Sequence, residues 1–240
     1  MSPFGLRAGH RPAIEIVGPP GSGKSTLMAA LQEARPDIAL IARYDGVVGR
    51  PAYARATLSI ARELGAVVGG RPSRRELEWM VRVAVSAAVL DAGGGSRASM
   101  VAFAQGPLYT LARLAPLVGP EGRVSVPRAR GWWLRELRRW RDRLDGVILL
   151  DADDDVLLER IHGRDKHHAL QGLPDGRARV VLADWRARYE MMLSHATGPR
   201  VPGGAESVIR FDTAVTAAAI IAELVADRFT GSNPVVASTD

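Results

Sequence analysis

Residues 18–25 read Gly18-Pro19-Pro20-Gly21-Ser22-Gly23-Lys24-Ser25, and Thr26 follows. The stretch matches the pattern G-x-x-x-x-G-K-[ST] at every position. Its glycines let the backbone wrap closely around an anion and turn N–H groups toward phosphate oxygens, and a helix that opens near Ser25 adds the positive end of its dipole. Lys24 would neutralise the β- and γ-phosphates, and the Ser25 hydroxyl would ligate Mg²⁺. We therefore predict that residues 18–26 bind a nucleoside triphosphate, which we expect to be ATP, together with Mg²⁺. The preference between ATP and GTP stays open.

The sequence on either side of this loop has the order that a phosphate-binding loop requires. Residues 13–17 (Ala-Ile-Glu-Ile-Val) form a short β-branched run between Pro12 and Gly18, which predicts a buried strand. Residues 25–34 predict a helix that ends before Pro36. The alternative is a glycine-rich turn that matches the pattern by chance, and the strand–loop–helix order disfavours it.

Strands and helices alternate along the rest of the chain. Short apolar runs predict strands at 38–41, 100–104, 147–150 and 208–211, and helical patterns cover 50–91, 108–117, 132–144, 153–162, 175–194 and 216–229. The pattern Ser73-x-x-Glu76 is typical of a capping box after a break at 69–72. This alternation predicts an α/β three-layer sandwich of the P-loop NTPase type, with a five-stranded parallel sheet covered by helices on both faces. We expect one domain at 13–229 with a helical insertion at 46–98, a flexible N-terminus at 1–12 and a flexible tail at 230–240.

Composition restricts the class of protein. The chain has 240 residues and no cysteine, which excludes disulfides and thiolate metal sites. No apolar run approaches the ~18 residues that span a bilayer, and residues 1–12 lack the apolar core of a signal peptide. We therefore expect a cytoplasmic protein without a membrane partner. Lys24 and Lys166 are the only lysines among the 32 basic residues. Lys24 lies in the phosphate loop, and Lys166 either faces the same phosphates or is a surface residue.

The second half of the chain narrows the class further. Residues 147–164 read Val-Ile-Leu-Leu-Asp-Ala-Asp-Asp-Asp-Val-Leu-Leu-Glu-Arg-Ile-His-Gly-Arg. This run resembles the strand, acidic turn and E-R-I-x-x-R helix of thymidylate kinases and of related nucleoside and nucleotide kinases. Residues 208–213 resemble the region that borders the nucleotide base in those families. The element order is similar over nearly the whole chain, although only the phosphate loop is highly specific.

The resemblance implies an ATP-dependent kinase that moves the γ-phosphoryl group to a small acceptor. It also implies a helical lid at 160–175, in which Arg160 and Arg164 offset the charge of the transition state. We expect these two arginines, four residues apart, to share one helical face, and Lys166, His167 and His168 to extend the basic loop. The alternative is a solvated, positively charged helix end. The histidines have no third ligand at suitable spacing for a metal site.

The end of the third predicted strand departs from the pattern of these kinases. They usually place an Asp or Glu followed by Arg there, whereas this chain has Ala104 and then Gln105. Ala104 cannot ligate a metal or accept a proton, so the acidic role has moved or the activity is reduced. Gln105 and Tyr109 could still contact substrate, or they could belong to an ordinary strand-to-helix turn.

Asp45 is the nearest acidic substitute, because related deoxynucleoside kinases hold a catalytic carboxylate at the end of the second strand. Asp45 could take the proton of an alcohol acceptor. It also precedes Gly46, and Asp-Gly is an ordinary turn pair. Asp151, at the end of the fourth predicted strand, is a weaker candidate for an outer contact to the metal.

The Trp- and Arg-rich run at 132–144 is the remaining conspicuous feature. Trp133, Leu137, Trp140 and Leu144 share one face at helical spacing, which favours a helix that covers a sheet. Stacking of nucleic-acid bases on these rings is disfavoured, since no nucleic-acid-binding module is visible. The alternative to a kinase is a P-loop ATPase or a regulatory NTP-binding protein without a small-molecule acceptor. The acceptor itself stays open among nucleosides, nucleotides, sugars and antibiotic alcohols, as does assembly into a homodimer.

Overall fold

The computed structural model describes residues 11–41, 50–65, 72–91, 98–115, 130–165, 168–196 and 208–230. Five parallel strands form one sheet in the order β2-β3-β1-β4-β5. Their bounds are β1 Ala13–Val17, β2 Ile38–Ile41, β3 Met100–Ala104, β4 Gly146–Asp151 and β5 Val208–Asp212. The prediction of a five-stranded parallel sheet is therefore confirmed, and the strand positions differ from the expected ones only at the ends of β4 and β5.

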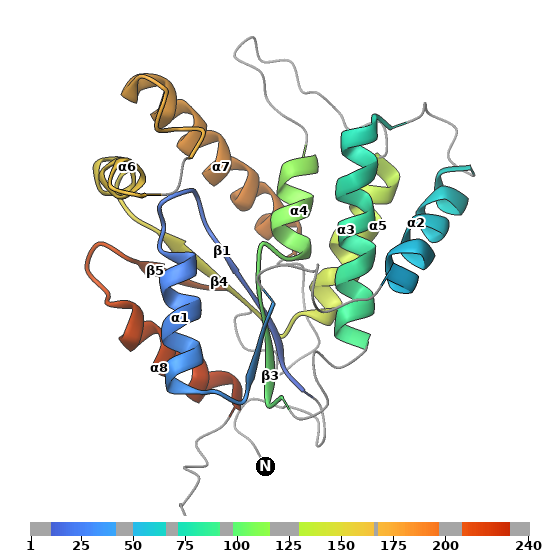
Figure 1. Ribbon diagram of the computed structural model, residues 1–240, viewed down its shortest axis with the longest axis horizontal. Coiled ribbons are helices and arrows are strands. Elements are labelled where there is room, and N and C mark those ends of the chain that lie inside the picture. Colours follow the sequence, from blue (N-terminus) through green and yellow to red (C-terminus); the bar gives the residue numbers. More distant parts are fainter. Residues whose placement is uncertain are drawn as a thin grey trace, which may run out of the picture.

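Helices cover both faces of this sheet, so the molecule has three layers (Figure 1). The helices are α1 Lys24–Ala34, α2 Arg50–Gly65, α3 Arg74–Asp91, α4 Pro107–Leu114, α5 Arg130–Arg143, α6 Asp154–His162, α7 Asp175–Ala196 and α8 Ala218–Thr230. Helices α1 and α8 pack together on one face, and α2 to α5 with α7 lie on the other (Figure 1). Within the described part of the chain, no helix is long and apolar enough to cross a membrane.

The side chains of β1 alternate between the two apolar layers. Ile14 and Ile16 belong to the core under α1 and α8, whereas Ala13 and Val17 belong to the core under α2 to α5. All five residues of β1 are buried, as expected for a central parallel strand that is covered on both faces. One of them is Glu15, a buried carboxyl group in an otherwise apolar strand.

The expected helical run over 50–91 divides into α2 and α3, and the capping box opens α3. The Ser73 backbone N–H donates to Glu76 Oε2 at 2.6 Å, and the Glu76 N–H donates to Ser73 Oγ at 3.2 Å. The two reciprocal bonds satisfy N–H groups that the first turn would otherwise leave without partners. The start of α3 is thereby fixed at the edge of the candidate site.

Helix α5 follows the prediction for the Trp- and Arg-rich run. Trp133, Leu137 and Trp140 are buried against the sheet, and Trp132 is buried with them. Trp133 Nε1 also donates to the Leu111 carbonyl oxygen at 2.9 Å, which ties α5 to α4. These indole rings are part of the core and cannot stack on nucleic-acid bases.

Candidate functional site

The phosphate loop joins β1 to α1, and its backbone has the shape that its glycines permit. Gly18, Gly21 and Gly23 have φ angles of 149°, 87° and 83°, values that L side chains rarely adopt. A Cβ atom on Gly18 would lie 2.1 Å from the Leu150 carbonyl oxygen, and one on Gly21 would lie 2.7 Å from that of Leu157. The loop is therefore packed against the end of β4 and against α6, and neither glycine can be replaced without moving the backbone.

The first turn of α1 is open to an anion. Its N-cap is Gly23, which provides no side-chain cap, and the turn contains no acidic residue. The N–H groups at a helix start need a partner, and a phosphate group is a suitable one. Five of the nine predicted loop residues line a cavity, namely Gly18, Pro20, Gly21, Lys24 and Ser25. The donor chemistry of the loop thus fits the phosphates of a nucleotide.

The side chain of Lys24 is hydrogen-bonded to the phosphate loop itself. Its Nζ donates to the carbonyl oxygens of Gly18 and Pro19, both at 2.8 Å, and to Ser22 Oγ at 3.3 Å. The pKa of the Lys24 ammonium is lowered to about 7, mainly by burial and also by the positive charge of Arg164, while the negative charge of Asp151 acts in the opposite direction. A phosphate group beside Lys24 would favour the protonated form.

A metal ion would find few protein ligands at this site. Among the described residues, no group of three or more His, Asp or Glu side chains could hold a metal. Ser25 lines the cavity at the first turn of α1, within the loop that holds the phosphates. Because Mg²⁺ commonly takes its ligands from substrate phosphates, water and one or two protein oxygens, the Ser25 hydroxyl fits the predicted role.

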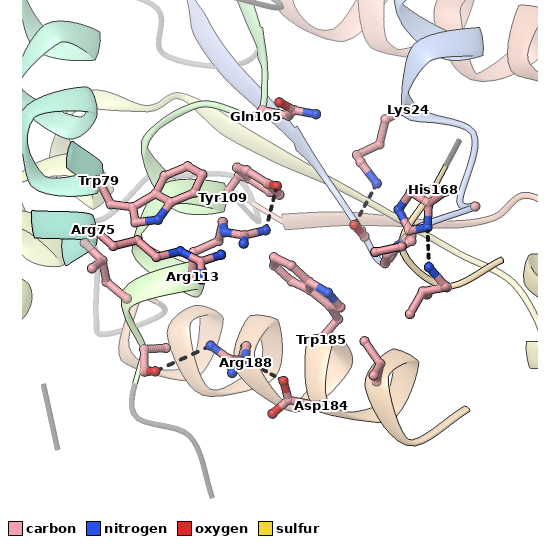
Figure 2. Close-up of a pocket in the computed structure, with 18 of the residues that line it drawn as sticks. Lys24, Arg75, Trp79, Gln105, Tyr109, Arg113, His168, Asp184, Trp185 and Arg188 are labelled. Carbon is pink, nitrogen blue, oxygen red and sulfur yellow. Dashed lines mark hydrogen bonds and ion pairs between the residues drawn. The ribbon is translucent and has the colours of Figure 1, made fainter. Parts of the chain in front are cut away.

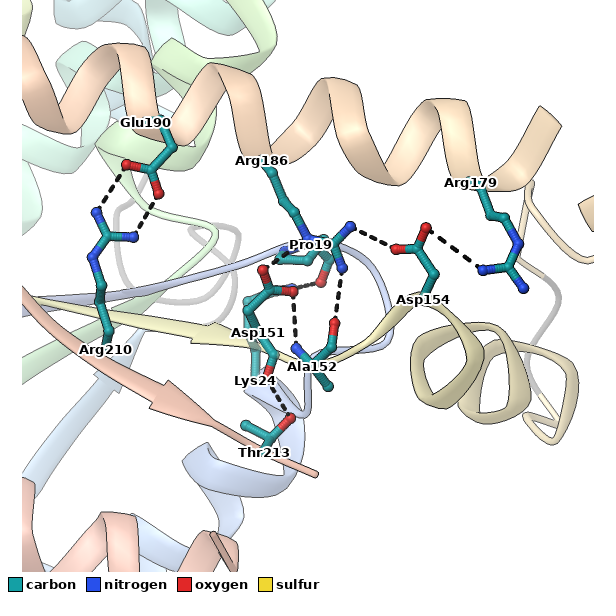
Figure 3. A network of polar contacts seen from close by, with 10 residues as sticks. All are labelled: Pro19, Lys24, Asp151, Ala152, Asp154, Arg179, Arg186, Glu190, Arg210 and Thr213. Carbon is teal, nitrogen blue, oxygen red and sulfur yellow. Dashed lines mark hydrogen bonds and ion pairs between the residues drawn. The ribbon is translucent and has the colours of Figure 1, made fainter. Parts of the chain in front are cut away.

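The carboxylate of Asp151 is committed to an arginine. Arg186 of α7 donates from Nε to Asp151 Oδ2 at 2.7 Å, from one terminal nitrogen to Asp154 Oδ1 at 2.5 Å and from the other to the Ala152 carbonyl oxygen at 2.8 Å (Figure 3). Asp151 Oδ1 accepts the Ala152 N–H at 2.9 Å. The network ties α7 to the end of β4, next to the phosphate loop. The role of Asp151 as an outer metal contact stays a prediction.

The two predicted lid arginines are separated. Arg160 lies in α6 and donates to Thr213 Oγ1 at 2.8 Å and to the Thr213 carbonyl oxygen at 2.7 Å, at the end of β5. Arg164 lies beyond the helix, is exposed and lines the cavity. The expectation that the two share one helical face is wrong, because α6 ends at His162. Their roles on the transferred phosphoryl group stay predictions.

The remaining residues that the sequence singled out differ in where the structure places them. His168 lines the cavity, and its backbone N–H donates to Gln171 Oε1 at 2.7 Å. Ala104 is buried at the end of β3, where it leaves no ionisable group. Asp45, Lys166 and His167 lie outside the described residues, as do 1–10 and 231–240 of the expected termini. The prediction for Asp45 as a general base therefore stays a prediction.

The cavity beside the phosphate loop has a volume of about 670 Å³. Its wall continues from the loop to the start of α3, to α4, to α7 and to residues 168–170. In Figure 2, Lys24 and His168 lie on one side, and Arg75, Trp79 and Arg113 lie on the other. The size is that of a site for a small molecule.

Aromatic rings from three helices meet in this wall. Tyr109 of α4 stacks on Trp185 of α7 with ring centroids 5.5 Å apart and an interplanar angle of 8°. Trp79 of α3 meets Tyr109 edge to face at 6.4 Å, and Trp185 is also stacked on Tyr189 at 5.7 Å. Of these residues the sequence indicated only Tyr109. Trp79 lies far from Tyr109 and Trp185 in the chain, so no spacing rule connects it to them, whereas Trp185 and Tyr189 are four residues apart on α7.

Two arginines that the sequence did not single out belong to the same wall. Arg188 of α7 donates from Nε to Asp184 Oδ2 at 2.7 Å and from a terminal nitrogen to the Ala112 carbonyl oxygen at 2.9 Å. Arg113 of α4 lies over the ring of Trp79, with its guanidinium carbon 4.6 Å from the centroid, and donates to the Tyr109 hydroxyl at 3.3 Å. Arg188 thus joins two helices, whereas Arg113 is held mainly by aromatic rings.

The buried carboxyl group of Glu15 orients α4. Its two oxygens accept the backbone N–H groups of Leu108 and Tyr109, each at 2.8 Å. Burial raises the pKa of Glu15 to about 8, although these N–H donors act to lower it. Gly106 leaves room for the carboxyl group, since a Cβ there would lie 2.9 Å from Glu15 Cδ. A charged residue inside an apolar strand was the signal in the sequence that could have revealed this role.

Gln105 joins β3 to α4 in a strained conformation. Its φ angle of 67° is the only positive value of a non-glycine residue in the described part of the chain. Such conformations cost on the order of 1–3 kcal/mol and tend to occur at functional sites. The side chain is exposed and lines the cavity between the phosphate loop and Tyr109. This position suits the contact with substrate that the sequence suggested.

Comparison with known proteins adds a distant structural likeness. No protein-family model matches the chain, and no curated protein matches it significantly. Among solved structures, the chain is similar to the shikimate kinase from Acinetobacter baumannii in complex with shikimate, with 17% sequence identity, a TM-score of 0.45, and coverage of 91% of this chain and 92% of that chain. A likeness this distant does not identify a substrate. The strand order and the phosphate loop themselves give the fold, which is that of an α/β P-loop NTPase.

Proposed function

We propose that this protein is an ATP-dependent kinase that moves the γ-phosphoryl group of ATP to a small acceptor. One observation carries the proposal: a single cavity of about 670 Å³ runs from Lys24 and Ser25 to side chains of α3, α4 and α7. Hydrolysis of ATP requires space for only one water molecule besides the nucleotide. This cavity extends well beyond the phosphate loop, to arginines and aromatic rings of the helices. A second substrate of small-molecule size accounts for that space.

The residues divide the work as follows. The N–H groups of the loop and the Lys24 ammonium hold the β- and γ-phosphates, and Ser25 provides a ligand for Mg²⁺. When bound, Mg²⁺ neutralises charge on the phosphate oxygens. Arg164 lines the same cavity, from which its guanidinium can offset the charge that spreads over the transferred group. The acceptor occupies the part of the cavity between Lys24 and the aromatic wall.

The proton of an alcohol acceptor needs a base, and Ala104 cannot supply one. We assign that role to Asp45, which follows β2 in the sequence. Transfer to an acceptor whose attacking oxygen is already anionic would not need Asp45 at all. The dependence of turnover on Asp45 is therefore tied to the type of acceptor.

A second candidate is an ATPase or a regulatory NTP-binding protein without a small-molecule acceptor. The observation that favours it is the end of β3, where Ala104 and Gln105 provide no ionisable side chain. In this case Lys24 and the loop still bind ATP, and the cavity beyond them has another use.

An ATP-consumption screen against a metabolite library separates the two candidates. The Lys24→Ala variant serves as the blank, and circular dichroism establishes that it is folded. We expect one acceptor class to raise the turnover of the wild type sharply and to leave Lys24→Ala inactive, because Lys24 contributes charge at the phosphates rather than packing. Turnover that is indifferent to every small molecule would favour the ATPase, and near-normal turnover by folded Lys24→Ala would refute both.

A further inference from the structure

The cavity wall opposite the phosphate loop carries more positive charge than the loop requires. Among the described residues, five cationic side chains line the cavity, namely Lys24, Arg75, Arg113, Arg164 and Arg188, and the carboxylates that line it are Glu76 and Asp184. Lys24 and Arg164 serve the phosphates of ATP in the proposed function. The remaining arginines therefore need a separate account.

The two carboxylates are already engaged. Asp184 is paired with Arg188, which also donates to the backbone carbonyl oxygens of Ala112 in α4 and of Ala115, directly after α4. Glu76 accepts the Ser73 N–H in the capping box. Neither Arg75 nor Arg113 forms an ion pair with any carboxylate of the described ranges. Two guanidinium groups thus line the cavity without a counter-charge from these parts of the chain.

Arg113 is held in place without being neutralised. Its guanidinium carbon lies 4.6 Å from the centroid of Trp79, 5.8 Å from that of Trp185 and 5.9 Å from that of Tyr109. Contact with aromatic rings orients a guanidinium and leaves N–H donors at its edge free for an anion. Among the described residues, its one hydrogen bond to a side chain, to the Tyr109 hydroxyl, is long at 3.3 Å.

The aromatic rings of the wall are already in contact with side chains of the protein itself. Trp79 has the guanidinium of Arg82 at 4.4 Å in addition to that of Arg113 at 4.6 Å. Trp185 is stacked on both Tyr109 and Tyr189. These contacts argue that the wall recognises its ligand through charge and N–H donors rather than by stacking a planar ring.

We infer that the acceptor carries a carboxylate or a phosphate group that is separate from the oxygen to be phosphorylated. This anionic group binds Arg113, and Arg75 contributes to its binding. This inference rests on the proposed function, since it names the class of acceptor for the same cavity. Uncharged nucleosides and sugars are excluded as the preferred acceptors. A guanidinium group suits both anions, because a carboxylate and a phosphate each offer at least two oxygens that can accept parallel N–H hydrogen bonds.

Anion binding can be measured without turnover. The wild type is saturated with Mg²⁺ and a non-hydrolysable ATP analogue, which fills the phosphate loop, and is then titrated separately with inorganic phosphate and with acetate. Tryptophan fluorescence reports binding, because Trp79 and Trp185 flank Arg113, whereas the tryptophans of α5 are buried in the core. We expect a saturable change with at least one anion; phosphate alone indicates a phosphate-bearing acceptor and acetate alone a carboxylic acid.

Two variants give the comparison its control. Arg113→Gln should weaken anion binding by about tenfold or more, the usual worth of a hydrogen bond to a charged group. Arg82→Gln removes a guanidinium from the same Trp79 ring, but Arg82 is exposed and does not line the cavity, so binding should be unchanged. No saturable response to either anion, or equal behaviour of the two variants, would overturn the inference.

Failure of the anion site and failure of the kinase proposal give different experimental results. Anion binding that depends on Arg113, without any acceptor-stimulated turnover, would leave this site standing and remove the kinase. An uncharged acceptor that supports turnover with the same KM in the wild type and in Arg113→Gln would remove the anion site and leave the kinase.

Discussion

Replacing Glu15 with glutamine is expected to change how the stability of this protein depends on pH. Glu15 is completely buried in β1, and its two oxygens accept the N–H groups of Leu108 and Tyr109 at the start of α4. Burial raises its pKa from 4.5 to about 8. Glutamine has nearly the same shape and cannot ionise, so the variant isolates the effect of the charge.

The direction of the effect follows from the two pKa values. Between about 4.5 and about 8, the unfolded chain releases the proton of Glu15 while the folded chain keeps it. Stability therefore falls as pH rises through this window, by about 1.4 kcal/mol per pH unit at most. Below the window both states are protonated, and above it both are ionised, so the dependence disappears at either end. From about pH 5.5 to about pH 8.5 the wild type should lose roughly 3 kcal/mol through Glu15.

Urea unfolding of both proteins at about pH 5.5, 7 and 8.5 measures this difference. Glutamine offers one oxygen to two N–H donors, which costs a roughly constant 1–2 kcal/mol at every pH. The free energy of unfolding of Glu15→Gln relative to the wild type should therefore rise by about 3 kcal/mol across the range. Exposed Glu223, on α8, provides a matched Glu→Gln substitution that controls for the loss of one negative charge.

A relative stability that stays constant within about 0.5 kcal/mol would refute this reasoning. It would mean that Glu15 is ionised in the folded protein over the whole range. The two N–H donors and the positive end of the α4 dipole would then outweigh the desolvation of the carboxylate.

The remaining predictions concern catalysis. Arg164→Ala should lower kcat by on the order of 10²-fold or more with little change in ATP affinity, because an arginine that acts on transition-state charge has this signature. Steady-state kinetics measures both quantities. A change in the KM for ATP alone would contradict the lid role. Asp45→Asn should lower kcat by about 10²- to 10⁴-fold with an alcohol acceptor and leave ATP binding largely unchanged, because it removes basicity but keeps shape. A loss below about fivefold with an established alcohol acceptor would leave Asp45 with a turn role.

The sheet was predictable because its strands carry local signals. Each strand of this parallel sheet is a short apolar run between turn residues, and the runs at 13–17, 38–41 and 100–104 match β1, β2 and β3 without a shift. The phosphate loop was predictable for a related reason: eight consecutive residues specify its backbone, and the positive φ angles of Gly18, Gly21 and Gly23 follow from their lack of a Cβ.

The aromatic wall of the cavity could not be predicted because its residues meet only in three dimensions. Trp79, Tyr109 and Trp185 come from α3, α4 and α7, and each helix also buries apolar residues at ordinary helical spacing. No pattern within one helix distinguishes a ring that lines a cavity from one that fills the core. Trp133 and Trp140 of α5 show the other outcome, since they are buried against the sheet.

The expected pairing of Arg160 and Arg164 failed for a local reason. Four-residue spacing places two side chains on one face only while the helix continues. Gly163 is the C-cap of α6, and its N–H donates to the Glu159 carbonyl oxygen at 2.9 Å. Arg164 is therefore free of the helix and lines the cavity, while Arg160 stays in α6 and binds Thr213.

Strand β1 connects the two halves of the candidate site. Its last residue, Val17, leads directly into the phosphate loop, and Glu15, two residues earlier, holds the start of α4. Helix α4 in turn carries Tyr109 and Arg113, which form the wall across the cavity from Lys24 (Figure 2). One short strand and one buried carboxyl group thus connect the phosphate loop to the cavity wall formed by α4. In the proposed kinase, in-line transfer would tolerate little change in the separation of donor and acceptor. The position of Glu15 would therefore matter for catalysis, although Glu15 does not line the cavity.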